Sequence, residues 1–359
     1  MDVADLTREL VSIPSHEDET AAGDFVESWL REQTAAAVER DEDGNVFARV
    51  GEGETTLALA GHHDVVPPDD SQVDADGSYV VERRDGRLYG RGTADMKGCV
   101  AAAMCALRDV DPAALGCELV FVSFVAEEAG CLGSEAAVDD GFAPDYAVVG
   151  EGSTGYSAAG VTDVAVAHKG RRGSTITAHG TAAHASEPES GENAIYRASD
   201  AVDVVRDLEF PSTDVMGHEV AGSVAVTEID GGSAWNVVPE RCEVTVDERT
   251  VPGERAPIER VEELPGVEWT VDQDLPPMAC EDAAFADLVL GVAADSQDGT
   301  PEHVVKPHAT DAGNLARAGT DCVVVGAAEP GEAHTADESV SLDVLERCYR
   351  IYRSVAERL

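Results

Sequence analysis

Two neighbouring acidic residues, Glu127 and Glu128, directly follow an apolar run at residues 117–126 and precede Ala129 and Gly130. A continuous apolar run that ends at a turn signal is typical of a buried strand. Two carboxylates side by side at the end of such a strand repel each other unless positive charge lies beside them. The chain is therefore expected to fold so that a cation reaches the end of this strand.

Four other segments carry possible metal ligands at, or just beyond, the ends of β-like apolar runs. Histidine and carboxylate side chains are common ligands of divalent metals in hydrolases. The residues are His62 and Asp64 in G-H-H-D-V-V-P, Asp95 in G-R-G-T-A-D-M-K-G, Glu151 in V-V-G-E-G-S and His334 in E-A-H-T-A-D-E. With the acidic pair, this layout predicts a hydrolase that binds two metal ions.

Short strand-like runs alternate with helical stretches along the chain, which indicates an open α/β sheet. In such sheets ligands bind beyond the carboxyl ends of the strands, where the acidic residues fall. After helices at residues 6–10 and 25–30, elements are expected at residues 46–50, 56–60, 96–110, 119–125, 134–138 and 146–149. The pattern resumes at residues 285–293, 311–318, 322–325 and 340–357. We predict a catalytic α/β domain with a mostly parallel central sheet.

The sequence pattern changes from about residue 168. Strands are expected at residues 174–179, 223–229, 241–249 and 267–271, and helices at residues 192–208 and 255–263. These elements make a compact α+β unit whose length lies within the normal range for a domain. The predicted organisation is a catalytic domain at residues 1–167 and 274–359, interrupted by an inserted domain at residues 168–273.

The chain is strongly acidic, with 71 Asp and Glu residues against 25 Lys and Arg and a formal net charge of −46. Its apolar content of 43% is normal for a buried core, so the charge does not indicate disorder. Such a surface repels itself in dilute buffer, and about 1 M salt, with a Debye length of about 3 Å, screens most of that repulsion. We expect a cytoplasmic protein of a salt-accumulating halophile that binds neither nucleic acid nor anionic membranes.

Eight cysteines are dispersed along the chain without a C-x-x-C pair, which disfavours a disulfide framework or a structural zinc knot. The first ten residues are acidic and amphipathic and do not have the pattern of a signal peptide. No apolar run approaches the length needed to span a bilayer. These features agree with the expected cytoplasmic location.

Two divalent ions need several anionic or imidazole ligands and one carboxylate that they share. We assign Asp95 as the shared ligand, His62 and Glu151 to one ion, and Glu128 and His334 to the other. One histidine and two carboxylates per ion suit zinc and would tolerate cobalt or manganese. Two zinc ions are therefore the expected cofactors.

Asp64 and Glu127 are left without a metal in this assignment. Asp64 lies two residues after His62 on an extended segment, so its side chain points to the same side and can orient the imidazole. Glu127 stands beside Glu128 on a turn and is expected to act as general base toward the attacking water. A positioned base accelerates a reaction by about 10²–10⁴-fold.

Taken together, these motifs resemble the co-catalytic zinc amidohydrolases that include acetylornithine deacetylase, succinyl-diaminopimelate desuccinylase, carboxypeptidase G and the aminoacylases. The resemblance covers nearly the whole chain and includes E-E-A-G, H-x-x-x-P, N-A-I and N-V-V-P. It implies the ligands and base assigned above, with Asp64 in support. It also implies a zinc-exopeptidase-like catalytic domain whose inserted lid domain forms a homodimer.

The resemblance further implies three residues of the lid domain at the substrate. His184 would reach the active site of a partner subunit and stabilise the oxyanion. Asn236 and Arg249 match substrate-binding positions, with Arg249 gripping a carboxylate bidentately. The segment H-A-T-D at residues 308–311 departs from the family pattern near the substrate pocket, and this leaves the choice of substrate open.

The resulting hypothesis is a metal-dependent hydrolase that cleaves the amide bond of a small N-acyl amino acid. The motifs are most similar to those of the acetylornithine deacetylase and desuccinylase branch. A carboxypeptidase or dipeptidase of the same family, acting on a peptide, is the alternative. A non-catalytic, metal-stabilised binding protein is a further reading, whereas a calcium buffer is disfavoured because D-A-D-G at residues 74–77 lacks the glutamate of an EF-hand loop.

Overall fold

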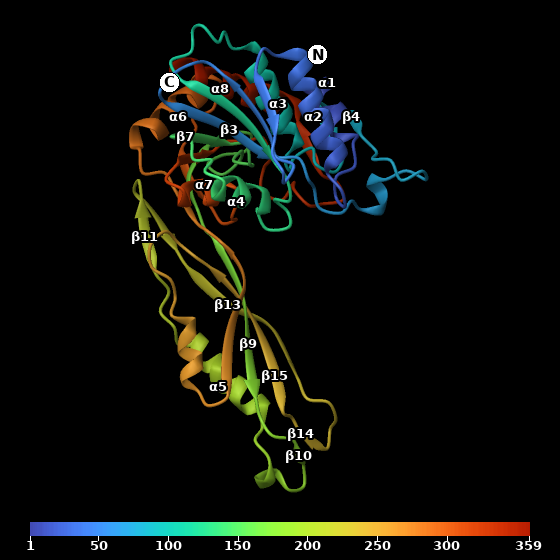
Figure 1. The fold of residues 1–359 in the computed structure, drawn as a ribbon, viewed down its shortest axis with the longest axis vertical. Helices are drawn as coiled ribbons and strands as arrows, with labels where there is room; N and C mark the ends of the chain where they lie inside the picture. The colour runs from blue at the N-terminus through green and yellow to red at the C-terminus, as the bar shows by residue number, and fades with distance from the viewer. The chain divides into compact units, whose positions relative to one another are not determined.

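A nine-stranded mixed sheet forms the centre of the larger of two units in the computed structural model, which describes residues 1–359 (Figure 1). The larger unit comprises Met1–His168, Met278–Lys306 and Thr310–Leu359, and the smaller comprises Lys169–Pro277 and Pro307–Ala309. The chain passes between the units after His168 and before Met278, and again at Pro307–Ala309, whereas the inserted domain was predicted at residues 168–273.

The four central strands of the large sheet run parallel, in the order β6-β3-β7-β19. Antiparallel strands flank them on both sides. In sheet order, the strands are β1 (Ala37–Arg40), β2 (Val46–Val50), β6 (Glu118–Phe124), β3 (Thr56–His62), β7 (Tyr146–Val149), β19 (Asp321–Val324), β8 (Val164–His168) and β17 (Met278–Ala279), with β18 (His303–Lys306) parallel to β8. The predicted α/β class with a parallel sheet centre is confirmed.

Helices cover both faces of this sheet, because its central strands are apolar on both sides. One face packs against α4 (Leu132–Asp139) and α7 (Ala312–Arg317), in a core that includes Phe124 and Leu315. On the other face, α3 packs against β3 and is buried along residues 97–107. This helix, α3, spans Lys97–Asp109. The other helices on this side are α1 (Val3–Val11), α2 (Thr20–Gln33), α6 (Ala283–Asp295) and α8 (Leu342–Arg358). None of the helices is both long and apolar enough to cross a lipid bilayer.

A small three-stranded sheet, in the order β20-β5-β4, completes the larger unit. Its strands are β4 (Glu82–Arg84), β5 (Arg87–Tyr89) and β20 (Ser339–Ser341), and the 3₁₀ turn η1 (Asp70–Gln72) precedes them. The pairing of β20 with β5 places the segment after His334 beside the segment that leads to Asp95.

The smaller unit is an antiparallel sheet in the order β13-β15-β9-β16, with α5 and the 3₁₀ helix η3 packed on one face. Its strands β9 and β15 alternate buried and partly exposed residues, as expected for a sheet with one covered face. The elements are β9 (Arg171–His179), β10 (Ala183–His184), η2 (Pro188–Ser190), α5 (Ala194–Arg206), β11 (Ser212–Val215), β12 (His218–Ala221), β13 (Ser223–Gly231), β14 (Val237–Val238), β15 (Arg241–Arg249), η3 (Ile258–Glu263) and β16 (Val267–Leu275).

The helix predicted at residues 255–263 is wrong in type and length. The structure has only the short 3₁₀ helix η3, which begins after Pro257 and ends before Pro265. Leu264, which precedes Pro265, has extended backbone, as proline favours in the residue before it, so the helix ends there. All eight cysteines are free and buried, in agreement with the prediction of no disulfide framework.

Candidate metal centre

The sheet register brings the ends of three parallel strands to one edge. Ala60 on β3 pairs with Val122 on β6 and with Val149 on β7. His62 is the last residue of β3, the acidic pair follows β6, and Glu151 follows β7 two residues after Val149. The side chains predicted to meet beyond the strands therefore emerge side by side.

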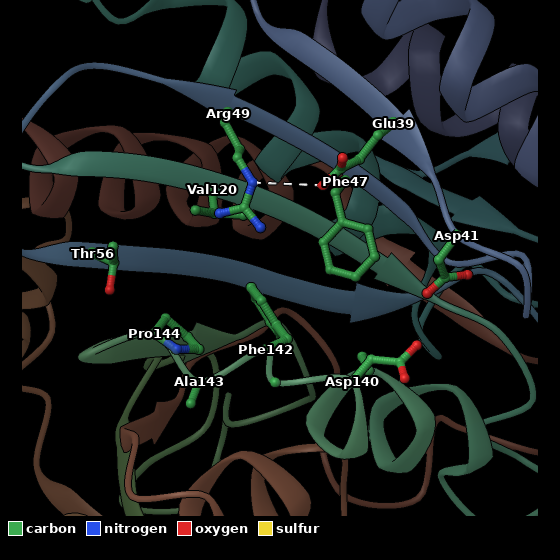
Figure 2. A pocket seen from close by; sticks show the side chains of 12 residues that line it. Glu39, Asp41, Phe47, Arg49, Thr56, Val120, Asp140, Phe142, Ala143 and Pro144 are labelled. Atoms are coloured by element: carbon green, nitrogen blue, oxygen red, sulfur yellow. Dashed lines mark ion pairs between the residues drawn. The ribbon is translucent and has the colours of Figure 1, made fainter.

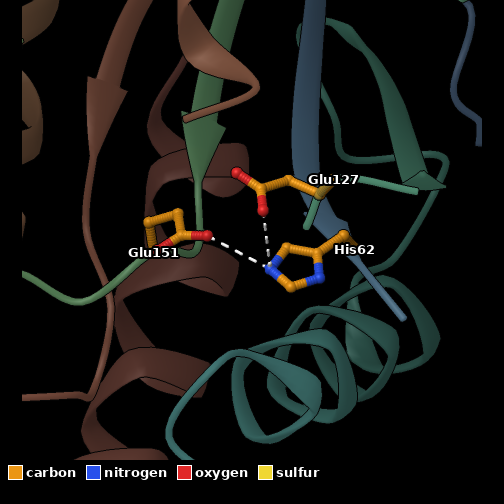
Figure 3. A group of neighbouring side chains, drawn as sticks. All are labelled: His62, Glu127 and Glu151. Carbon is orange, nitrogen blue, oxygen red and sulfur yellow. Dashed lines mark ion pairs between the residues drawn. The ribbon is translucent and has the colours of Figure 1, made fainter. Parts of the chain in front are cut away.

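The buried imidazole of His62 lies at the centre of this group. Its Nε2 atom is 3.2 Å from Asp95 Oδ1 and 3.3 Å from Glu151 Oε1. Glu127 Oε2 is 3.9 Å from the same nitrogen, and Figure 3 shows the carboxylates of Glu127 and Glu151 directed at the ring from two different segments, which follow β6 and β7. One imidazole nitrogen thus faces three carboxylates.

His334 forms the second half of the group. Its Nε2 atom is 3.1 Å from Asp95 Oδ2 and 3.0 Å from Glu128 Oε1. Asp95 therefore directs one oxygen toward each of the two histidines. Two groups of three residues each offer possible ligand atoms that lie within 4.8 Å of one another. One group is His62, Glu127 and Glu151, and the other is His62, Asp95 and Glu128.

Asp64 holds the acidic turn against the end of β3. Its carboxylate accepts the backbone N–H groups of Glu127 at 3.1 Å and Glu128 at 3.0 Å, and its Oδ1 lies 3.2 Å from His62 Nδ1. The turn is tight, since Ala126 and Cys131 have φ angles of 50° and 57°. One carboxylate thus fixes both the imidazole and the backbone of the acidic pair.

The proximity of these groups shifts their pKa values strongly. Burial alone would lower the pKa of His62, but hydrogen bonds to Asp64, Asp95 and Glu151 raise it well above its usual value. Hydrogen bonds to Asp95 and Glu128 raise the pKa of His334 to about 10. Both imidazoles are therefore stabilised as cations by the surrounding carboxylates.

The pKa of Glu127 is also raised, but for a carboxyl group this favours the neutral form. Burial raises the pKa of this carboxyl well above its usual value, and the nearby Glu151, Asp311 and Asp95 raise it further, although His62 lowers it. A carboxylate in this position binds a proton readily. This is the property that a general base toward water requires.

The donor set fits divalent cations. Buried carboxylates are stable only when positive charge compensates them. The carboxylates gathered here exceed the positive charge that His62, His334 and Lys306 provide. The carboxyl groups are Asp64, Asp95, Glu127, Glu128, Glu151 and Asp311.

Two residues at the site were not assigned from the sequence. Lys306 is buried, donates to the Gly152 carbonyl at 2.6 Å and lies 3.9 Å from Glu151 Oε2. Asp311 is buried, its Oδ1 has no hydrogen-bond partner, and burial raises its pKa to about 7. Lys306 is one of only three lysines in the chain, and this scarcity could have drawn attention to it, whereas Asp311 was noted only within the H-A-T-D segment.

The three residues expected to bind substrate lie in the smaller unit. His184 is exposed on β10, and its Nδ1 is 2.6 Å from Ser186 Oγ. His184 pairs in register with Val237 on β14, next to Asn236. Arg249, at the end of β15, donates to Asp247 Oδ1 at 2.8 Å.

A separate pocket of about 350 Å³ lies against β2 and the loop after α4 (Figure 2). Its lining shares no residue with the group around His62. Three of its charged side chains have partners, because Arg49 pairs with Glu39 and Glu118, and Asp41 accepts three backbone N–H groups. The possible metal ligands therefore lie at the strand ends and not in this pocket.

The chain matches a known protein family over most of its length. The model of peptidase family M20/M25/M40 matches residues 58–358. Acetylornithine deacetylases from Pectobacterium carotovorum and Pectobacterium atrosepticum are 35% identical over 214 residues, which is 58% of this chain and 54% of theirs. The matched region thus spans about half the length of these curated relatives.

Solved structures of low sequence identity share the fold. Aminopeptidase PepT from Bacillus cereus superposes with a TM-score of 0.80 at 18% identity, covering 99% of this chain and 97% of that one. An M20 family metallo-carboxypeptidase from Sulfolobus solfataricus gives a TM-score of 0.77 at 14% identity, covering 99% of each chain.

Proposed function

Because this chain belongs to peptidase family M20/M25/M40, a family of metal-dependent hydrolases, we propose that it cleaves the amide bond of a small N-acylated amino acid. The observation that carries this proposal is the position of Asp95, whose two carboxylate oxygens face His62 and His334. A carboxylate shared between two imidazole-bearing halves is the arrangement that a pair of catalytic cations requires.

We assign Asp95 as the shared ligand, His62 and Glu151 to one cation, and Glu128 and His334 to the other. Zinc is the first candidate, and cobalt and manganese fit the same mixed nitrogen and oxygen donors. When bound, such cations polarise the amide carbonyl and lower the pKa of water.

Glu127 is the proposed proton carrier. Its carboxylate faces the same space as Asp95 and Glu151, and its raised pKa favours uptake of a proton from the attacking water. The same group can then pass that proton to the leaving amine nitrogen. Asp64 keeps Glu127 in place through the backbone N–H of that residue.

The substrate side of the proposal is supported by the acetylornithine deacetylases, which are 35% identical over the matched region. We assign Arg249 to a substrate carboxylate, Asn236 to a further substrate contact and His184 to the oxyanion. The smaller unit exposes Tyr196, Ile229 and Trp235 to solvent, and apolar side chains of this size support a homodimer formed through this unit.

A second candidate function is peptide hydrolysis by a carboxypeptidase or dipeptidase activity. The solved structures of an aminopeptidase and a metallo-carboxypeptidase with the same fold favour it. Both candidates use the same ligands and base. They differ in the group on the carbonyl side of the scissile amide, which is a simple acyl group in the first candidate and an amino acid or peptide residue in the second.

The test is to strip the protein of cations, reload it with zinc, cobalt or manganese, and assay it in concentrated KCl. We expect amide hydrolysis of N-acetyl-ornithine or N-succinyl-diaminopimelate that requires the added cation. Faster cleavage of simple dipeptides would select the second candidate. A protein that binds no cation, or hydrolyses none of these amides when loaded, would contradict the proposal. We place this activity in the cytoplasm of a halophile, where the acidic surface would be screened.

A further inference from the structure

Arg91 and Glu338 occupy unassigned positions in the two motifs that carry Asp95 and His334. The Arg91 guanidinium forms an ion pair with Glu338 Oε2, and the two side chains are 4% and 0% exposed. A fully buried ion pair is rarely a net source of stability, because desolvation offsets its attraction. The other contacts of Glu338, with backbone N–H groups, indicate a further role for this pair.

The second oxygen of Glu338 binds the loop that leads to Asp95. Glu338 Oε1 accepts the backbone N–H of Gly92 at 2.9 Å, of Ala94 at 3.0 Å and of Asp95 at 3.3 Å. Three backbone N–H groups that converge on one carboxylate oxygen fix the local backbone, while the N–H of Thr93 binds the Gly90 carbonyl. The loop also needs glycine at position 92, where φ is 88° and a Cβ would lie 2.7 Å from Val65 Cγ1.

Glu338 also belongs to the segment that carries His334, four residues earlier. The Glu338 backbone accepts the N–H of Gly90 at 3.1 Å, and β20 begins at the next residue. The carboxylate of Glu338 thus connects the His334 segment to the Asp95 loop. The two connected segments are the ones that bring Asp95 Oδ2 to 3.1 Å from His334 Nε2.

We propose that Glu338 is a positioning residue of the metal centre, which sets the Asp95 loop against the His334 segment while Arg91 balances its charge. This inference deepens the proposed function and depends on it. It assigns the essential contact to the backbone N–H groups of Gly92, Ala94 and Asp95, and to the ion pair only a supporting part.

The smaller unit contains a comparable buried pair, and none of the proposed metal ligands belongs to this unit. Glu248 accepts from Arg172 and from the backbone N–H of Ala256 at 3.2 Å, and both charged side chains are buried. A Glu248→Gln variant therefore reproduces the loss of a buried ion pair and of little else. It separates a general loss of stability from a specific loss of cation binding.

The experiment compares two charge-neutral double variants of the full chain. In Glu338→Gln with Arg91→Met, the amide oxygen can still accept from the loop, whereas in Glu338→Leu with Arg91→Met the acceptor is lost. Cation binding is measured by titrating the metal-free proteins with Co²⁺ in concentrated KCl, without substrate, by calorimetry and by the visible absorption of bound cobalt. Amide hydrogen exchange at residues 92–95 is measured on the same metal-free samples.

We expect the wild-type protein and Glu248→Gln to bind two cobalt ions. The Leu double variant should lose affinity for at least one ion by tenfold or more and should exchange the amides of residues 94 and 95 faster, whereas the Gln double variant should stay within about threefold of wild type. Two ions bound with unchanged affinity by the Leu variant would overturn the inference alone. Should that variant fail to fold, wild-type exchange rates at residues 92–95 in the single variant Glu338→Ala would overturn it equally. A wild-type protein that binds no cobalt would overturn both the proposed function and this inference.

Discussion

The carboxylate of Asp64 accepts the backbone N–H of Glu127 at 3.1 Å, so the segment after β3 fixes the turn after β6. The same carboxylate also accepts from Glu128 and lies beside His62 Nδ1. Three groups of the proposed centre therefore share one anchor. A substitution of Asp64 is therefore expected to affect all three groups.

Replacing Asp64 by Ala should weaken cation binding by about 10–100-fold, because the imidazole and the acidic turn both lose their partner. Calorimetric titration with Zn²⁺ or Co²⁺ measures this change. Asp64→Asn serves as control, since its single carbonyl oxygen can keep one of the N–H bonds, and it should fall between wild type and Ala. Equal cation affinity in all three proteins would contradict the anchoring role.

Replacing Glu127 by Gln should lower kcat by about 10²–10⁴-fold while two cations still bind, because an amide cannot take a proton from water. Steady-state kinetics and metal analysis of the same sample measure the two properties. A kcat within threefold of wild type, at full metal content, would remove Glu127 from the proton-transfer step.

Removal of cations should destabilise the fold, because the carboxylates around His62 then lose compensating charge. At a free cation concentration about 100 times Kd, binding to the native state alone adds about 2.7 kcal/mol. Thermal unfolding with zinc and with a chelator tests this. Asp95→Ala is the control, and its midpoint should respond much less to zinc.

The thermal midpoint should rise as KCl increases from 0.1 to 3 M, since a net charge of −46 makes the folded surface repel itself. Calorimetry at several salt concentrations measures the effect. Replacing several exposed acids of the smaller unit by Asn or Gln should flatten the dependence. A midpoint that is constant or falls with salt would show that screening is unimportant for this protein.

Stability should fall between about pH 9 and pH 11, because burial raises the pKa of Cys105 to about 11 and of Cys280 to about 12. The unfolded thiols lose their protons from about pH 9, while the folded ones keep theirs, so alkali favours unfolding. Chemical denaturation across this range measures the slope. The double variant Cys105→Ala, Cys280→Ala should show a smaller slope, and an unchanged slope would exclude these thiols as its source.

The sequence located elements well where apolar residues and turn signals agree. The strands predicted at residues 46–50, 146–149 and 241–249 coincide with β2, β7 and β15. In contrast, β8 was missed, because V-A-V-A-H is buried on both faces and too short for periodicity to separate strand from helix. The short strands β17 and β18 give still less signal, since pairing with β8 alone defines them.

The candidate site could be predicted where each residue stands at the end of an apolar run, and the structure brings His62, Asp95, Glu128, Glu151 and His334 together. Lys306, Asp311 and Glu338 could not be found this way. Each is a charged side chain buried by contacts far away in the sequence, and local patterns carry no information about such partners.

The chain leaves the larger unit after His168 and returns at Met278, and these two residues are paired neighbours on β8 and β17. Departure and return at adjacent points mean that the strands around them close on each other whatever lies between. The pairing of His168 with Met278 thus closes the sheet of the larger unit at the point where the intervening segment is inserted. The proposed ligands and the proposed base all lie in the larger unit, so replacing the intervening segment should change the proposed substrate contacts and leave the proposed ligands in place.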